Sequence, residues 1–261
     1  MPNQLILAVP PGQLTAAGAY GLPLAHLAYR VGGGPHLFRA NTPAVPHGGL
    51  LVMDAARFDG QGEVTPFCHE VLRELAARSF TGVVCRFPGR PLPLLGEMLG
   101  QLGSLCAARD IPLYVSEHYG SAAPKAKVLI PSALSGGSLQ QRLEEALGRF
   151  GPGRVAMWAE RSAEDFLLPS PGGSGTPLTA EVLLARRQQY TPTVFFSDEL
   201  CAHYFTYMAG ETAHFVLFDD AGTVRKKLQV AQRLGVDPVF LPYADLADLL
   251  PELLSVSPPA P

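Results

Sequence analysis

The feature that most constrains the fold is a repeated alternation of short apolar runs with segments of helical periodicity. A conservative count gives about eight to nine strands, most of them separated by one helix. Such alternation is typical of a parallel sheet, because parallel strands need a crossover connection. The apolar runs occupy residues 5–10, 26–31, 49–55, 81–87, 111–118, 126–133, 154–160, 191–199, 214–220 and 238–244.

Several of the intervening segments carry helix signals. Thr65 and Pro66 suit the cap and first position of a helix over residues 65–80, and Ser138 and Gly151 suit the start and stop of another. Gly- and Pro-rich stretches at 32–49 and 168–177 predict loops. Further helices are predicted over residues 93–110, 179–190, 199–210, 221–235 and 244–254.

Chain length selects among parallel architectures. A (β/α)8 barrel typically takes about 250 residues, and this chain has 261, of which 47% are hydrophobic. We therefore expect a single-domain (β/α)8 TIM barrel over residues 1–250, followed by a C-terminal tail, 251–261. An open doubly wound sheet is the alternative.

Charge and hydropathy exclude several classes of partner. The net charge is −3 and no Lys/Arg block is present, so neither nucleic acid nor a membrane surface is an expected partner. The N-terminal apolar run of about five residues is too short for a signal peptide or a membrane span. We expect a soluble cytoplasmic protein. The sequence leaves the oligomeric state open.

Cysteine and histidine patterns indicate no metal. The four cysteines form no CxxC pair and are expected to be buried free thiols, with a disulfide or metal knuckle as the alternative. The seven histidines form no HxH or HExxH, which argues against zinc. The glycine-rich stretches 32–35 and 135–138 match neither a P-loop nor a dinucleotide fingerprint, so no cofactor is expected.

The last third of the chain carries a more specific pattern. The segment 218–241 contains, in this order, Phe218-Asp219-Asp220, Thr223, Lys227, Leu234-Gly235 and Val239-Phe240-Leu241. This order resembles the C-terminal segment of the family-18 glycoside hydrolases, the chitinase-like barrels that include spore-cortex and peptidoglycan enzymes. The resemblance extends over residues 26–245 and implies a TIM barrel that acts on a glycan.

Two further segments resemble this family. Residues 154–160 resemble its sixth strand, Met-x-Tyr-Asp, with Met157 retained, Ala159 in place of the tyrosine and Glu160 in place of the aspartate. Phe80 and Gly82 have the spacing that leads into the family's catalytic fourth strand.

The fourth strand itself departs from the family. There the family carries acids at alternate positions, ending in the glutamate that protonates the glycosidic oxygen. In this chain Val84 and Arg86 take acid positions, and Phe87 or Pro88 falls near the glutamate. Arginine does not release its proton near neutral pH, so the resemblance implies a barrel without the family's proton donor.

Arg86 has three possible roles. It pairs with Glu117 or Asp54 and plugs the barrel, or it faces an anionic ligand, or it is solvated at the rim. Barrel sites lie at the carboxyl ends of the strands. The polar candidates there are Asp54, Arg86, Glu117, His118, Trp158, Glu160, Asp198, Glu199, Asp219 and Asp220.

Two acids are candidates for a rebuilt catalytic pair, Glu117 and Glu160, which are expected on adjacent strands five and six. The alternative is that each lies at the rim or forms a salt bridge. Asp198 or Glu199, expected on strand seven, offers a further acid. Trp158 is either a sugar platform or a packing residue, and Met157 is core or pocket wall.

Asp219 and Asp220 remain from the C-terminal motif. Asp219 would help to shape the groove, and Asp220 would cap the next helix.

Three functions follow. The first is a degenerate chitinase-like barrel that binds a glycan or a small anionic or polar ligand; the others are a hydrolase of altered mechanism and a non-enzymatic scaffold. The residues expected to bind the ligand are Asp54, Arg86, Glu117, Met157, Trp158, Glu160, Asp198 and Asp219.

Overall fold

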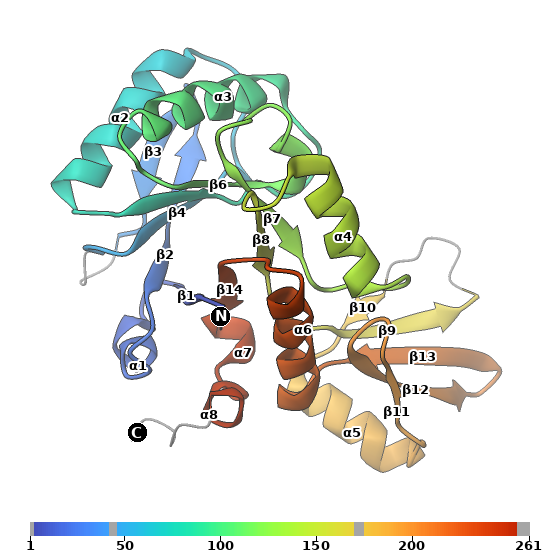
Figure 1. The fold of residues 1–261 in the computed structure, drawn as a ribbon. Coiled ribbons are helices and arrows are strands. Elements are labelled where there is room, and N and C mark those ends of the chain that lie inside the picture. The colour runs from blue at the N-terminus through green and yellow to red at the C-terminus, as the bar shows by residue number, and fades with distance from the viewer. Residues whose placement is uncertain (1–2, 42–45, 170–174, 255–261) are drawn as a thin grey trace.

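Eight parallel strands close into a barrel in the computed structural model, which describes residues 3–41, 46–169 and 175–254 (Figure 1). Strand β1 pairs with β14 on one side and with β2 on the other, which closes the ring. The (β/α)8 prediction is confirmed, and the open-sheet alternative is wrong. In ring order the strands are β1 (Leu5–Val9), β2 (Leu24–Gly32), β4 (Leu50–Asp54), β5 (Gly82–Cys85), β6 (Leu113–Ser116), β7 (Lys127–Pro131), β8 (Val155–Trp158) and β14 (Val239–Pro242).

Side-chain alternation divides each strand between two cores. Residues such as Val84, Tyr114 and Phe240 point inward and fill the barrel. Their neighbours, such as Val83 and Val115, point outward and pack in the large core that also contains the helix residues. Side chains beyond the ends of the strands therefore face the barrel mouth only when they continue the inward set.

Helices cover the barrel unevenly. The longer ones are α2 (Val64–Ala77), α3 (Pro93–Ala107), α4 (Leu139–Phe150) and α6 (Ala221–Arg233). Short turns replace regular helices elsewhere: α1 (Leu14–Gly18), the 3-10 turn η1 (Glu117–Tyr119), α7 (Tyr243–Leu246) and α8 (Leu250–Leu253). No helix within the described ranges is long and apolar enough to cross a membrane.

The helix-start predictions have mixed outcomes. Ser138 caps α4 through Gln141, and Gly151 follows the helix, as predicted. Thr65 lies inside the first turn of α2, whose cap position is Glu63, so the predicted cap is wrong. The predicted loop 32–49 contains a strand, β3 (His36–Arg39), which pairs antiparallel with β2. Residues 42–45 of that stretch lie outside the described residues.

An antiparallel sheet is inserted between β8 and α6, on one side of the barrel (Figure 1). The predictions of barrel strands at 191–199 and 214–220 and of a helix at 199–210 are therefore wrong. Those segments form β11, β13 and β12, because their alternating aromatic residues favour a sheet and Gly210 permits a tight turn. The insertion comprises β9 (Ala163–Leu168), β10 (Thr176–Pro177), α5 (Ala180–Tyr190), β11 (Phe195–Ser197), β12 (Ala202–Ala209) and β13 (Thr212–Phe218).

A buried ion pair ties the insertion to the barrel. Lys227 Nζ donates to Asp219 Oδ2 at 2.6 Å, and the Ser162 amide donates to the same oxygen at 2.6 Å. Thr223 Oγ1 donates to Asp219 Oδ1 at 2.8 Å. Ser162 is where the chain leaves the barrel, and Asp219 is where it returns. The side chains of Lys227 and Asp219 are 1% and 0% exposed, so the pair is fully desolvated.

Asp219→Asn is expected to lower the free energy of unfolding by about 3–5 kcal/mol, because Lys227 would be left as an uncompensated buried charge. Urea denaturation at neutral pH measures this. Lys226→Met is the matched control. Its lysine pairs with the exposed Asp198 at 3.1 Å, and its loss should cost no more than about 1 kcal/mol. Equal losses for the two variants would contradict the assignment.

Candidate ligand-binding site

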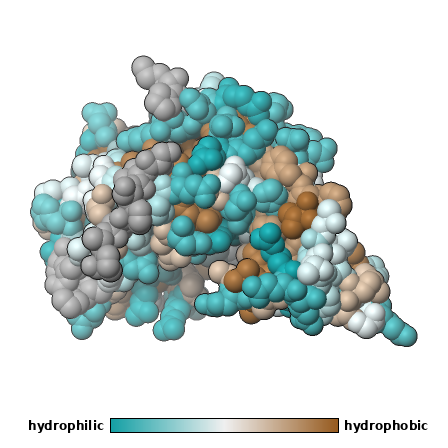
Figure 2. Space-filling view, turned by 90° about the horizontal axis from the view of Figure 1, so that it is seen from below, coloured by the Kyte–Doolittle hydropathy of each residue, from teal (hydrophilic) through white to brown (hydrophobic). Residues whose placement is uncertain are grey.

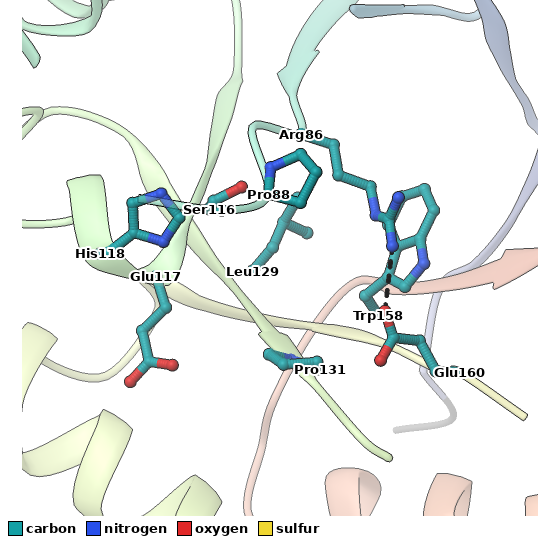
Figure 3. A pocket seen from close by; sticks show the side chains of 10 residues that line it. Arg86, Pro88, Ser116, Glu117, His118, Leu129, Pro131, Trp158 and Glu160 are labelled. Carbon is teal, nitrogen blue, oxygen red and sulfur yellow. Dashed lines mark hydrogen bonds and ion pairs between the residues drawn. The ribbon is translucent and has the colours of Figure 1, made fainter. Parts of the chain in front are cut away.

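A hollow of about 230 Å³ opens at the carboxyl ends of the barrel strands (Figure 3). Its walls come from the segments that end or follow β5, β6, β7 and β8, where barrel proteins carry their sites. Apolar side chains form part of the wall and polar side chains converge on it. The lining residues are Arg86, Pro88, Gly89, Ser116, Glu117, His118, Leu129, Pro131, Trp158 and Glu160.

Arg86 stands at the mouth because it continues the inward set of β5. Its amide donates to the Met53 carbonyl at 3.0 Å, which extends the pairing by one residue beyond the strand. Its Nη2 donates to Glu160 Oε1 at 3.0 Å (Figure 3). The predicted partners Glu117 and Asp54 are wrong, since Arg86 reaches across the mouth to the segment after β8. The side chain remains 41% exposed, so it does not plug the barrel.

Trp158 is a packing residue rather than a sugar platform. Its ring stacks on Phe240 of β14 with centroids 5.6 Å apart and an interplanar angle of 19°. The Arg86 guanidinium lies 5.0 Å from the centroid of the Trp158 ring. The residue is 4% exposed. A sugar ring therefore has no free face of this indole on which to stack.

Glu117 and Glu160 do not form a carboxylate pair. Glu117 accepts hydrogen bonds from both terminal nitrogens of Arg142 on α4, one of them at 3.3 Å. Figure 3 shows its carboxylate pointing away from Glu160. The two residues follow the fifth and seventh barrel strands, with β7 between them, so the predicted adjacency is wrong. Residues 154–160 likewise contain the seventh barrel strand and not the sixth.

His118 and Ser116 add neutral polar groups to the hollow. Burial lowers the pKa of His118, and a hydrogen bond to the backbone of Phe87 partly opposes this shift. The charge of Glu117 also opposes it, and the net lowering of the pKa favours the neutral form of the ring. Ser116 Oγ accepts from the Phe87 amide at 2.9 Å, which ties the segment after β6 to the segment after β5.

Sequence reasoning missed five of the lining residues. Four of them lie at or just after the end of a barrel strand, as the charged candidates do, and Leu129 points inward from the middle of β7. Their small or apolar side chains drew no attention, although a pocket wall needs such groups. They are Pro88, Gly89, Ser116, Leu129 and Pro131.

Four of the eight residues expected to bind the ligand do not line this hollow, which corrects their predicted placement; they are Asp54, Met157, Asp198 and Asp219. Met157 points outward into the core between strands and helices. Asp198 follows β11 in the insertion and pairs with Lys226. Asp219 is sealed in its pair with Lys227. Position along the chain predicts the mouth for each of them, but it does not determine the direction of a side chain.

The remaining acids have local roles. Asp54 is exposed at the end of β4, where its carboxylate accepts from the Ala56 amide at 3.0 Å, and it does not line the hollow. Asp220 caps α6 by accepting from the Thr223 amide at 2.9 Å, as predicted. Glu199 lines a shallow surface depression beside α4 and α6, outside the barrel mouth.

Metal-binding groups do not gather in the described part of the chain. Among those residues, no three His, Cys, Asp or Glu side chains lie where they would hold one ion. All four cysteines are buried free thiols.

Comparison with solved structures shows which fold this barrel shares. The spore cortex-lytic enzyme SleL of Bacillus megaterium superposes with a TM-score of 0.66 at 14% identity, covering 92% of this chain and 70% of that one. A chitinase from Chromobacterium violaceum gives 0.65 at 15% identity, covering 92% and 93%. The chain has the fold of the family-18 chitinases. The resemblance noted over residues 26–245 is thus confirmed at the level of the fold.

A plant relative in fold was solved with a sugar. The family-18 chitinase of Cycas revoluta, in complex with (GlcNAc)3, gives a TM-score of 0.61 at 12% identity, covering 97% of this chain and 98% of that one. No family model and no curated protein matches the sequence.

Trp158 is the single tryptophan of the chain, so its fluorescence reports on the mouth alone. Arg86→Ala should increase quenching of Trp158 by acrylamide, because the guanidinium and its stem cover the ring. Arg86→Met, which keeps an apolar stem over the indole, should remain near wild type. Loss of the Arg86–Glu160 pair should cost about 1 kcal/mol of stability or less. Unchanged quenching in Arg86→Ala would show that Arg86 does not cover the ring.

Proposed function

We propose that this chitinase-like barrel binds a small polar ligand, in the first instance a sugar, at its carboxyl-terminal mouth, and that it does not cleave glycosidic bonds by the family-18 route. One observation carries the proposal. The fourth barrel strand presents Val84 and Arg86 on its inward face and Pro88 beside the hollow, with no carboxyl group among them.

The chemistry of glycoside hydrolysis supports the second half of the proposal. The leaving oxygen must receive a proton from an acid within hydrogen-bond reach, and the two carboxyl groups of a glycosidase stand about 5–9.5 Å apart across an open cleft. The carboxylates that line the hollow, Glu117 and Glu160, are each bound by a different arginine. Arg86 itself has no proton to give near neutral pH.

The geometry of the mouth supports the first half. Ligand sites combine apolar walls with a few convergent polar groups, and Leu129 and Pro131 supply such walls beside Arg86, Ser116 and Glu160. The hollow measures about 230 Å³, which is below the ~300–1,000 Å³ of drug-sized ligand pockets and limits the ligand to about one sugar ring. The fold relative from Cycas revoluta holds (GlcNAc)3, which makes an N-acetylated sugar the first ligand to test.

A scaffold role is the second candidate, and the surface of the insertion favours it. Seven of the eight large hydrophobic residues that are exposed in the described structure belong to the insertion. In Figure 2 the apolar colour gathers on the side where the insertion lies in Figure 1. Exposed apolar patches mark interaction surfaces. The seven are Leu167, Leu168, Val182, Leu184, Phe195, Phe196 and Met208.

Hydrolysis and binding are tested side by side. We expect calorimetry with N-acetylglucosamine at millimolar concentration to give saturable binding, and product analysis to show no cleavage of its oligomers. Removing a properly placed acid typically costs roughly 10²–10⁴-fold in rate, and here both carboxylates of the hollow are also held by arginines, so we expect no turnover above that of buffer. Glu117→Gln and Glu160→Gln should leave this absence unchanged.

Asp54→Asn, at an exposed strand end outside the hollow, is the matched control. Cleavage that disappears in Glu117→Gln or Glu160→Gln, but persists in Asp54→Asn, would replace the proposal with a hydrolase of altered mechanism. Absence of sugar binding together with self-association in solution would favour the scaffold.

A further inference from the structure

Arg86 sets the class of ligand. Resting on the proposed binding site, we infer that the ligand of the hollow carries a carboxylate, which the guanidinium of Arg86 receives. The inference stands on the hydrogen bonds of Arg86, on its fixed position and on the charges around it.

The guanidinium has donors left for a ligand. Arginine carries five N–H groups in a fixed fork that matches a carboxylate. Within the described residues, the hydrogen bond from Nη2 to Glu160 is the one that the Arg86 side chain makes. The side chain is 41% exposed and lines the hollow. The remaining N–H groups are therefore available to a second carboxylate.

Arg86 is already held where a ligand would meet it. The guanidinium lies against the Trp158 ring, 5.0 Å from its centroid, while Glu160 binds one of its nitrogens. Trp158 is in turn stacked on Phe240. A side chain fixed on two sides loses little rotamer freedom on binding, which is the advantage of a preorganised receptor.

The surrounding charges do not oppose an anion. Glu117 lies on the hollow, but Arg142 balances its charge through two hydrogen bonds. Glu160 engages Arg86 through one oxygen, and its side chain is 29% exposed, so this pair is hydrated and weak. Arg86 and Glu160 together are neutral. A ligand carboxylate thus joins the free side of the guanidinium or displaces Glu160 into water.

A neutral sugar has fewer favourable contacts available at this mouth than a sugar acid. The indole of Trp158 is 4% exposed and offers no stacking face. The apolar part of the wall is made of Leu129, Pro131 and Pro88, which present small surfaces without an aromatic plane. Recognition therefore depends on polar contacts, and Arg86 makes a charge-assisted one with an acid group. A sugar acid of about one ring suits both the volume and the charge.

Two sugars with the same ring, one with a carboxylate and one without, measure the contribution of the carboxylate to binding. N-acetylmuramic acid is N-acetylglucosamine with a lactic acid ether, and its carboxamide derivative keeps the shape without the charge. Calorimetry on the full chain should show the acid binding about tenfold or more tightly than either neutral sugar. Arg86→Gln should remove this preference. Glu160→Gln should strengthen binding of the acid, because Arg86 loses its competing partner.

Arg109→Gln removes an exposed cation that donates to the Leu105 carbonyl at the end of α3, and it should bind like the wild type. If Arg86→Gln is unstable in a thermal melt, Arg86→Lys is used instead, since it keeps the charge without the fork. Equal affinities for the acid and the neutral sugars would overturn the inference and leave the proposed function standing. No binding of any of the three sugars would overturn both.

Discussion

The buried pair of Asp219 and Lys227 is the interaction on which the site depends. Asp219 binds the Ser162 amide, where the chain leaves the barrel, and Lys227 also donates to the Glu160 carbonyl at 3.4 Å. The same pair therefore fixes the base of the insertion and the backbone of the residue that faces Arg86. A desolvated charge is tolerated only with its partner in place, so this junction has one stable arrangement.

The barrel separates what maintains the fold from what determines the chemistry. Inward residues deep in the strands, such as Ile6, Val52 and Phe240, fill the interior with side chains. The next inward position on β5 is Arg86, at the mouth. The Arg86 side chain lines the hollow and does not belong to the apolar set that fills the barrel below it. The residues that maintain the barrel and those that line its mouth are thus separate, in keeping with the independence of fold and function.

The strand–helix alternation and the alternation of faces were sufficient to predict the barrel and the inward position of Arg86. The partner of Arg86 was not predictable, because it lies across the mouth on a strand that is distant in sequence. The insertion was also missed. Apolar runs such as 214–220 indicate a strand but not the sheet to which it belongs, and the period-2 pattern of 202–209 was read as a helix. Asp219 was expected to shape the groove, yet its role is buried and structural.

Arg86 changes the mouth in two ways at once. It places a cation among the residues that line the hollow, and its guanidinium also lies against the only tryptophan of the chain. Without this guanidinium the indole would be uncovered on that side. The cation at the mouth and the cover over the indole are therefore both supplied by the same residue. The mouth therefore presents a fixed cation beside apolar walls. Discrimination between ligands at such a site depends on charge and hydrogen bonds.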